Sequence, residues 1–229
     1  EMSASLVGSE MCIRDRSDNG ILLPSARRLI NIYERRIYVS QEECRRFENK
    51  LAYHAAPSLL GIKCANLISL ENDEFNILGQ IERFNEIAGG RKLKIRLMCR
   101  CKKRTLLLLY NEKLLLKCLS EPARREILKA YGYGGSLFKL ESDLERLAER
   151  ISSENEFPHE IGIFLGYPAE DVKGFIIHKG NNFKLCGCWK VYGDEEKARR
   201  SFTNYDKCRK FLCNKLNQGS DIYRALRIS

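Results

Sequence analysis

The side chains best suited to chemistry gather in one stretch of the chain, residues 157–192. An imidazole, a carboxylate, a thiol, an amine and a phenol occur there, and the candidate ligand-binding residues are His159, Glu160, Cys186, Lys190 and Tyr192. Alternate residues of a strand share a face, so a strand over 184–192 would place the last three side by side. If that strand pairs with one over 160–166, His159 would lie beside them. The sequence therefore predicts a small pocket for a small molecule or a protein partner.

The same stretch allows a catalytic interpretation. A papain-like hydrolase or amidase needs a thiolate within hydrogen-bond reach of an imidazole, and a third group that orients the ring. His159 would be the base and Cys186 the nucleophile. His159 could equally form an ordinary hydrogen bond at the edge of a strand. The sequence leaves open whether the protein is an enzyme.

A strand predicted over 92–102 offers a different function, because it is apolar at odd positions and basic at even positions. Eight of the fourteen residues from Arg91 to Arg104 are lysine or arginine. Such side chains can contact phosphates, and the candidates for nucleic-acid contact are Lys92, Lys94, Arg96 and Arg100. No aromatic residue lies among them to stack on bases, and charge also protects an edge strand from pairing. Nucleic acid is an alternative partner that the sequence does not favour.

The cysteine spacing argues against a metal centre. The chain has ten cysteines but no C-x-x-C pair, and the C-x-C pairs at 99–101 and 186–188 are tighter than structural zinc sites usually require. The chain also lacks a P-loop, a G-x-G-x-x-G fingerprint and an H-E-x-x-H motif. We predict no metal and no cofactor, and cysteines that are reduced, as in the cytoplasm.

The composition is that of a soluble globular protein. Hydrophobic residues make up 44% and charged residues 31% of the 229 positions. No apolar run approaches the roughly 18 residues that a membrane-spanning helix needs. The net charge of +10 favours anionic partners in general without identifying one. These features predict a basic cytoplasmic protein that does not bind membranes.

The chain divides into four parts. Residues 1–16 show no periodicity and resemble translated sequencing-adapter read-through, so they are expected to be a non-native extension. Residues 17–37 are expected to form a basic helix or linker, 38–217 a single domain, and 218–229 a C-terminal tail.

The predicted elements mix helices and short strands without a regular β-α-β order. Helices are expected over 40–53, 75–87, 120–132, 137–151, 168–178 and 194–217, and strands over 92–102, 105–110, 160–166 and 184–192. Ser40 and Glu43 form a capping box, and Asp194 caps the last helix. The apolar run over 58–70 is compatible with either state. The fold class is therefore α+β, a short mixed or antiparallel sheet packed with several helices.

Three stretches resemble motifs of an uncharacterised bacterial family, the domain of unknown function 3793. The first motif is His54–Leu67 (HAAPSLLGIKCANL), the second is Phe157–Ile176 (FPHEIGIFLGYPAEDVKGFI), and the third is Cys186–Tyr192 (CGCWKVY). The resemblance extends from about Ser40 to Cys213. It implies a family and a bacterial origin, but no mechanism, because the family carries no established activity.

Overall fold

The computed structural model describes residues 39–101, 103–134, 139–153 and 157–228. The helices described there are α3 (Gln41–Leu59), α4 (Ile77–Ala88), α5 (Glu112–Leu119), α6 (Pro122–Ala130), α7 (Leu140–Ser153), α8 (Ile161–Phe164), α9 (Ala169–His178), α10 (Glu195–Asn217) and α11 (Ile222–Ala225). The strands are β1 (Ala65–Glu71), β2 (Leu93–Arg100), β3 (Arg104–Asn111), β4 (Leu185–Cys186) and β5 (Lys190–Val191). The predicted extension over 1–16 and the predicted helix or linker over 17–37 lie outside the described residues.

Strand β3 is the centre of a three-stranded antiparallel sheet with the order β1-β3-β2. Its side chains are apolar on both faces. Leu107 and Leu109 belong to one hydrophobic cluster, and Leu106 and Leu108 belong to the other. All four are buried. A short, unbroken apolar run is typical of a strand that is covered on both sides, so the sheet needs a layer of helices on each face.

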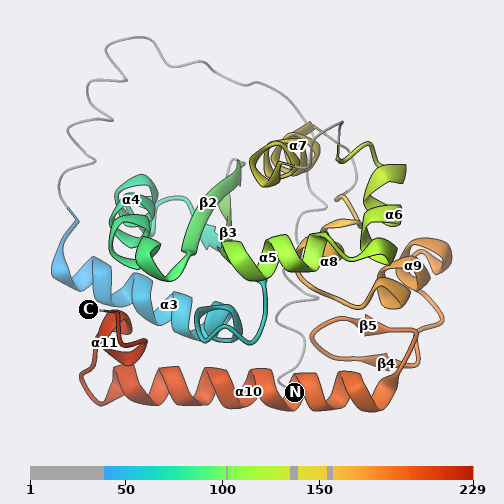
Figure 1. The fold of residues 1–229 in the computed structure, drawn as a ribbon. Coiled ribbons are helices and arrows are strands. Elements are labelled where there is room, and N and C mark those ends of the chain that lie inside the picture. Colours follow the sequence, from blue (N-terminus) through green and yellow to red (C-terminus); the bar gives the residue numbers. More distant parts are fainter. Residues whose placement is uncertain (1–38, 102, 135–138, 154–156, 229) are drawn as a thin grey trace, which may run out of the picture.

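Two layers of helices meet this need (Figure 1). On one face, α3 and α4 contribute Phe47 and Phe84 to the core. On the other face, α5 and α7 contribute Leu115 and Leu144. The long helix α10 runs from the β4–β5 hairpin past α3 to α11, so it touches elements that belong to both layers.

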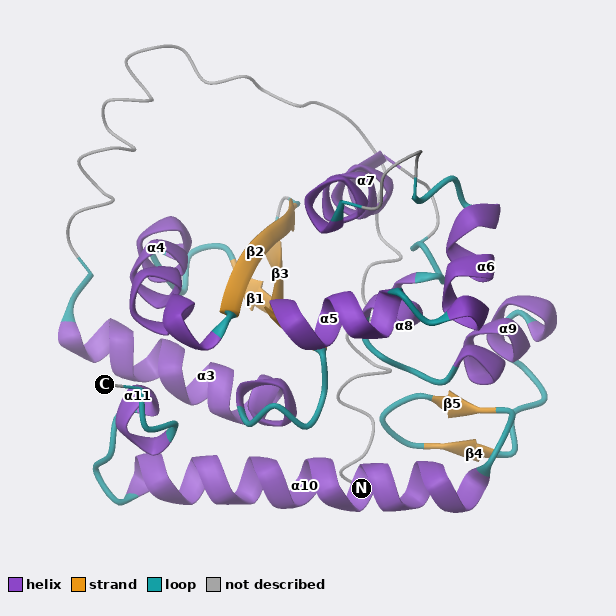
Figure 2. Ribbon diagram, in the orientation of Figure 1, coloured by secondary structure: helices purple, strands orange, loops and turns teal. Residues whose placement is uncertain are grey.

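The fold class is α+β, as predicted, with antiparallel strand pairs surrounded by helices (Figure 2). Ser40 and Asp194 cap their helices as predicted, but only the serine half of the predicted capping box forms, because the Glu43 carboxylate accepts the N–H of Asn76 instead, at 2.7 Å. The Ser40 hydroxyl accepts the N–H of Glu43 at 3.1 Å, and the Asp194 carboxylate accepts the N–H of Lys197 at 3.0 Å. Helix α3 continues beyond its predicted end to Leu59, and the ambiguous run over 58–70 contains the last turn of α3 and most of β1.

The strand predicted over 160–166 is wrong, because these residues form helix α8 and its C-terminal cap. Gly166 has a φ of 76°, and the N–H of Tyr167 bonds back across it to the carbonyl oxygen of Gly162 at 2.9 Å. A left-handed glycine with such a bond is a common helix ending. The apolar run is too short for its periodicity to distinguish a helix from a strand.

The second predicted strand, over 184–192, is in fact a hairpin. Its halves are β4 and β5, and Cys186 lies opposite Lys190 across the ladder. The chain turns at Gly187, whose N–H donates to the carbonyl oxygen of Trp189 at 3.1 Å. A side chain added at Gly187 would collide with the ring of Phe202 on α10. The glycine therefore allows the turn to lie against that helix.

The alternation predicted over 92–102 holds only to Leu97. A register irregularity lies between Leu97 and Cys99, and Met98 and Cys99 are both buried. Such a bulge shifts the following side chains by one position. The face that was expected to be basic and solvated is covered by α7, with which Met98 shares a hydrophobic cluster. Helix α5, which follows the sheet directly, was not predicted.

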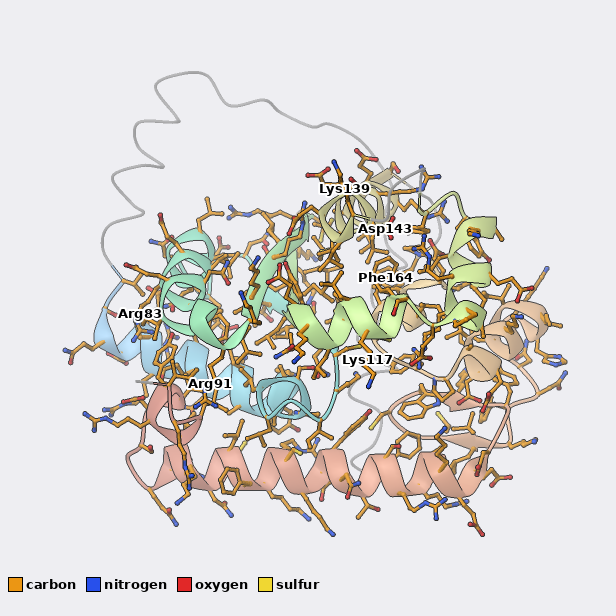
Figure 3. All side chains as sticks on the ribbon, viewed as in Figure 1. Arg83, Arg91, Lys117, Lys139, Asp143 and Phe164 are labelled. Atoms are coloured by element: carbon orange, nitrogen blue, oxygen red, sulfur yellow. The ribbon has the colours of Figure 1, made fainter. Side chains whose placement is uncertain are left out.

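The segment over 218–229, expected as a tail, adds helix α11 to the core. Ile222 is fully buried, and its N–H donates to the Glu48 carboxylate of α3 at 3.1 Å. The same carboxylate pairs with Arg83 of α4 at 3.1 Å, where Figure 3 labels the arginine. A four-residue helix shows no readable period, so this contribution was not visible in the sequence.

Replacing Ile222 tests whether the C-terminal segment is part of the fold. Ile222→Ala should lower the free energy of unfolding by about 2–4 kcal/mol, because a buried side chain is removed and a cavity remains. Urea unfolding followed by circular dichroism measures the change. Arg224→Ala is the control, because that side chain is 82% exposed, and it should change the value by less than about 0.5 kcal/mol. Equal stability of the wild type and Ile222→Ala would show that residues 218–229 are a detached tail.

Candidate functional site

Asp171, in the first turn of α9, attaches the third motif to the second. Its carboxylate accepts hydrogen bonds from Trp189 Nε1 at 2.7 Å and from the N–H groups of Tyr192 and Gly193 at 2.7 and 2.8 Å. Asp171 is buried, and a buried carboxylate needs such donors to offset the loss of hydration. The hairpin therefore cannot shift along α9 without leaving a buried charge unpaired.

This attachment places one face of β5 against one face of α9. Phe175 and His178 lie three residues apart and share a helix face. The Lys190 ammonium lies 5.8 Å from the centre of the Phe175 ring, and the rings of His178 and Tyr192 stack at 5.6 Å and 10°. The His159 ring lies 5.0 Å from that of Phe175. We call this region the α9–hairpin surface and define it by His159, Phe175, His178, Phe183, Lys190 and Tyr192.

The α9–hairpin surface carries positive charge that is not neutralised locally. Lys190 Nζ donates to the carbonyl oxygen of Gly180 at 2.7 Å and lies 5.0 Å from the Phe183 ring centre. Among the residues that the structure describes, no carboxylate forms an ion pair with Lys190 or with the neighbouring Lys179 and Lys184. An ammonium has three donors. Lys190 can therefore donate to a further acceptor.

Tyr192 adds a donor to the same surface. Its hydroxyl oxygen is buried and has no hydrogen-bond partner within the described ranges. Burial, and after it the charge of Asp171, raises the pKa of Tyr192, so the hydroxyl keeps its proton at neutral pH. Buried polar groups are nearly always paired in folded proteins. The hydroxyl therefore marks a position where a bound molecule would gain a hydrogen bond.

Glu160, predicted for the same pocket, points elsewhere. It is fully buried, and its carboxylate accepts hydrogen bonds from Arg150 Nε at 2.6 Å and from the Tyr133 hydroxyl at 2.9 Å. Burial and the nearby Glu160 charge raise the pKa of Tyr133. These are the contacts of a charged pair that holds α7 against the start of α8.

The structure does not join the proposed catalytic pair. Cys186 is exposed and lies opposite Lys190, and the imidazole of His159 rests against Phe175. In the described part of the chain, no hydrogen bond connects the Cys186 thiol with the His159 imidazole. Papain-like hydrolysis depends on that connection, so catalysis by this pair stays a hypothesis without geometric support.

Two of the four residues proposed for nucleic-acid contact are paired with carboxylates. Lys94 lies 3.1 Å from the Glu112 carboxylate of α5. Arg96 pairs with two glutamates of α7, one of them at 3.7 Å. Lys92 and Arg100 are exposed. The positive charge of β2 is therefore partly used to hold helices against the edge of the sheet.

The first motif meets the other two at Lys63 and Tyr167, a contact that the sequence did not predict. Lys63 is only 4% exposed, and its ammonium lies 5.0 Å from the centre of the Tyr167 ring. The Tyr167 hydroxyl donates to the carbonyl oxygen of Cys188 at 3.3 Å, and its ring stacks on Trp189 at 5.1 Å. Cation–π and stacking contacts thus connect all three motifs. The only signal for this in the sequence was their joint resemblance to one family.

The described residues contain no group of three or more His, Cys, Asp or Glu side chains that could hold a metal ion. None of the described helices combines the length and apolar character needed to cross a membrane. The cysteines described there are free thiols.

The fold and the site define an α+β protein in which three sequence motifs meet around a buried lysine. A family model described as "Protein of unknown function (DUF3793)" matches residues 51–226. The match covers most of the chain, so the chain belongs to this family. The comparisons found no curated protein and no solved structure that match it.

Removal of the Asp171 carboxylate tests its role in holding the hairpin. Trp189 is the single tryptophan of the chain, so tryptophan fluorescence reports directly on this contact. Asp171→Ala should shift the emission to longer wavelength and lower the free energy of unfolding by about 3 kcal/mol or more, because three hydrogen bonds to a buried charge are lost. Urea unfolding followed by this emission measures both effects. Glu149→Ala removes an exposed carboxylate from α7 and should alter neither, and unchanged emission in Asp171→Ala would contradict the assignment.

Proposed function

We propose that this protein binds a small anionic ligand with a planar or apolar group at the α9–hairpin surface. The observation that carries the proposal is the combination of two aromatic rings with two donors, one partly exposed and one shielded from solvent without a partner. Lys190 and Tyr192 supply the ammonium and the hydroxyl, and Phe175 and Phe183 supply the rings. Small-molecule sites typically combine apolar walls with a few polar groups that fix the orientation of the ligand.

Charge supports an anion rather than a neutral or cationic ligand. Lys179, Lys184 and Lys190 contribute ammonium groups near the surface. Of the two α9 carboxylates that lie against the hairpin, Asp171 is occupied by three donors, and Glu170 lies beside Gly193. The excess of positive charge in the whole chain adds long-range attraction. Hydrogen bonds to an ionised acceptor are also shorter and stronger than those between neutral groups.

The size of the surface supports a small molecule rather than a protein. Six side chains define it, whereas a stable protein interface takes roughly 20–30 residues on each side. Ile177 is 72% exposed on α9 and could extend the contact, so a protein partner with an acidic segment is the other outcome to test. We infer the cytoplasm as the compartment, since the described cysteines are free thiols and a reducing environment preserves them.

A pair of dyes separates the charged from the apolar part of the site. The probes are 8-anilinonaphthalene-1-sulfonate, which is anionic, and N-phenyl-1-naphthylamine, which is neutral. Lys190→Gln should raise the dissociation constant of the sulfonate about tenfold, the effect of losing roughly 1.4 kcal/mol of charge-assisted hydrogen bonding. The same change should leave binding of the neutral dye unaltered. Fluorescence titration measures both constants.

Matched variants control for binding elsewhere on the protein. Phe183 and Phe211 are exposed to similar extents, 41% and 46%. Phe183→Ser should weaken both dyes, and Phe211→Ser, on α10, neither. Lys173→Gln also leaves both constants unchanged, since that lysine is paired with a glutamate of α6. If Lys190→Gln binds the sulfonate as tightly as the wild type, the proposal is wrong.

Native mass spectrometry of protein purified at low ionic strength can identify the natural ligand. The wild-type protein should carry an adduct whose exact mass indicates a carboxylate or a phosphate. Tyr192→Phe removes only the hydroxyl and should reduce the occupied fraction. An adduct that persists equally in Lys190→Gln and Tyr192→Phe would place the binding site elsewhere. An adduct with the mass of a protein would favour the acidic partner.

A further inference from the structure

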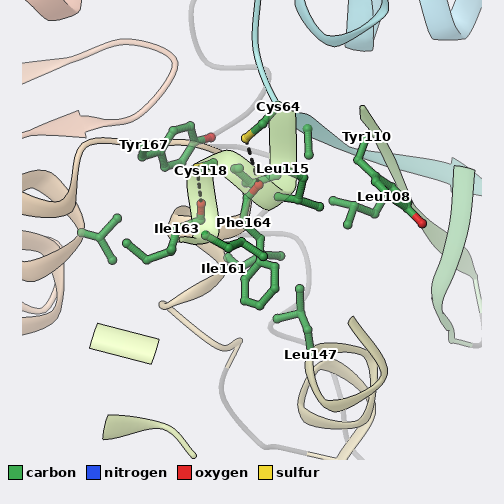
Figure 4. Packing of buried hydrophobic residues seen from close by; sticks show 14 of the residues in the cluster. Cys64, Leu108, Tyr110, Leu115, Cys118, Leu147, Ile161, Ile163, Phe164 and Tyr167 are labelled. Atoms are coloured by element: carbon green, nitrogen blue, oxygen red, sulfur yellow. Dashed lines mark hydrogen bonds between the residues drawn. The ribbon is translucent and has the colours of Figure 1, made fainter. Parts of the chain in front are cut away.

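Two buried thiols meet where the sheet, α5 and α8 come together. Cys64 directly precedes β1, and Cys118 lies in the last turn of α5. The Cys64 thiol donates to the carbonyl oxygen of Phe164 at 3.4 Å, and the Cys118 thiol donates to that of Ile163 at 3.5 Å. Figure 4 shows both sulfur atoms beside these two consecutive carbonyl groups. In place of the Ile163 carbonyl oxygen, the single proton of the Cys118 thiol can be donated to the Cys64 sulfur.

The surroundings give the two sulfurs different roles. The hydrogen bond from Cys118, supported by the charges of Lys63 and Arg124, lowers the pKa of Cys64 in spite of burial. The same hydrogen bond, together with burial, raises the pKa of Cys118. Nη1 of Arg124 lies 3.1 Å from the Cys118 sulfur. The lowered pKa gives Cys64 the larger share of thiolate, which is the nucleophilic form of cysteine.

The backbone around the pair leaves room for little else. A Cβ atom on Gly166 would lie 2.7 Å from the Cys64 sulfur, so the second motif passes the thiol with bare backbone. Cys64 and Cys118 are 7% and 8% exposed. Only a small reagent can therefore reach them in the folded protein.

We propose that Cys64 and Cys118 form a reversible disulfide when the protein meets a hydroperoxide such as hydrogen peroxide. The Cys64 thiolate attacks one peroxide oxygen, the O–O bond breaks, and a sulfenic acid and hydroxide result. The Cys118 sulfur then attacks the Cys64 sulfur, the S–O bond breaks, and the departing hydroxide takes the Cys118 proton as water. The proton that Cys64 released on ionising neutralises the hydroxide of the first step. In sum, two thiols and one hydrogen peroxide give one disulfide and two waters, and an organic hydroperoxide would give an alcohol and one water instead. An external thiol reverses the reaction by thiol–disulfide exchange.

The disulfide has a direct structural consequence. It removes both S–H donors, so the carbonyl groups of Ile163 and Phe164 lose their bonds to sulfur and α8 must readjust. It also joins the start of β1 to the end of α5. The proposal does not depend on ligand binding at the α9–hairpin surface.

Peptide mapping of the full-length wild-type protein tests the proposal. Reduced protein is treated with hydrogen peroxide, unfolded in urea that contains N-ethylmaleimide to block the remaining thiols, and digested without a reducing agent. Mass spectrometry should find a peptide pair joined through Cys64 and Cys118. If dithiothreitol is added after the peroxide and before the blocking step, two separately alkylated peptides should replace the pair. Recovery of both residues as alkylated thiols or as sulfinic acids after peroxide would overturn the proposal.

Two variants check the mechanism. In Cys118→Ser the resolving thiol is absent, so dimedone, added with urea after the peroxide so that it can reach the buried residue, should trap Cys64 as a sulfenic acid. Cys44→Ser removes a thiol of the same exposure, 8%, from α3, and the yield of the cross-link should not change. If dimedone labels Cys64 in the wild type as fully as in Cys118→Ser, the sulfurs do not meet and the proposal fails. The wild-type mapping needs no substitution, so it decides the question even if a variant does not fold.

Discussion

Strand β3 carries leucines on both of its faces, so it is stable only between two layers of helices. Each buried leucine contributes roughly 1.5–3 kcal/mol, and a domain is stable by only about 5–15 kcal/mol in total. Loss of either layer would therefore remove a large part of the stability. One layer holds α3 and α4, and the other holds α5, α7 and α8. Because α8 lies in the second layer, residues 160–165 of the second motif are buried in the core, whereas His159 just before them is exposed.

From that core, a series of directional contacts leads outward to the α9–hairpin surface. The Glu160 carboxylate, held by Arg150 and Tyr133, fixes the start of α8. The left-handed Gly166 ends the helix, and Asp171 then attaches the third motif to α9. Each contact is specific in its donors and acceptors, whereas the apolar contacts around it are not. The position of the surface therefore depends on a few buried polar groups.

The features that could be predicted from the sequence are those that depend on residues close together in the chain. The side chains of Ser40 and Asp194 cap the helices that they precede, and the run from Leu106 to Leu109 is the central strand. The predictions that were wrong concern residues whose structure depends on partners distant in the chain. The apolar run 160–166 forms a helix because of its surroundings and its glycine cap, and the basic face of β2 is covered because glutamates of α7 lie opposite Arg96.

The same distinction applies within the candidate site. His159, Lys190 and Tyr192, predicted as a group, do lie along α9 and the hairpin, although the geometry that was expected to bring them together was wrong. Glu160 is adjacent to His159 in the chain but points to the opposite side, into the core. Adjacent residues of a strand point to opposite faces, so even the predicted strand would not have placed the Glu160 and His159 side chains in one pocket. The direction of Glu160 is set by its partners Arg150 and Tyr133, which come from other parts of the chain.

Tyr167 is the residue at which the three motifs meet. Its ring contacts Lys63 of the first motif, and its hydroxyl and ring contact the third. Its carbonyl oxygen accepts a hydrogen bond from Arg124, the side chain that also contacts the Cys118 sulfur. Packing accounts for this tyrosine and for the glycine before it. Packing alone does not explain why two thiols donate to adjacent carbonyl groups, or why the buried Tyr192 hydroxyl has no partner. These groups are therefore the ones for which a role beyond folding should be tested.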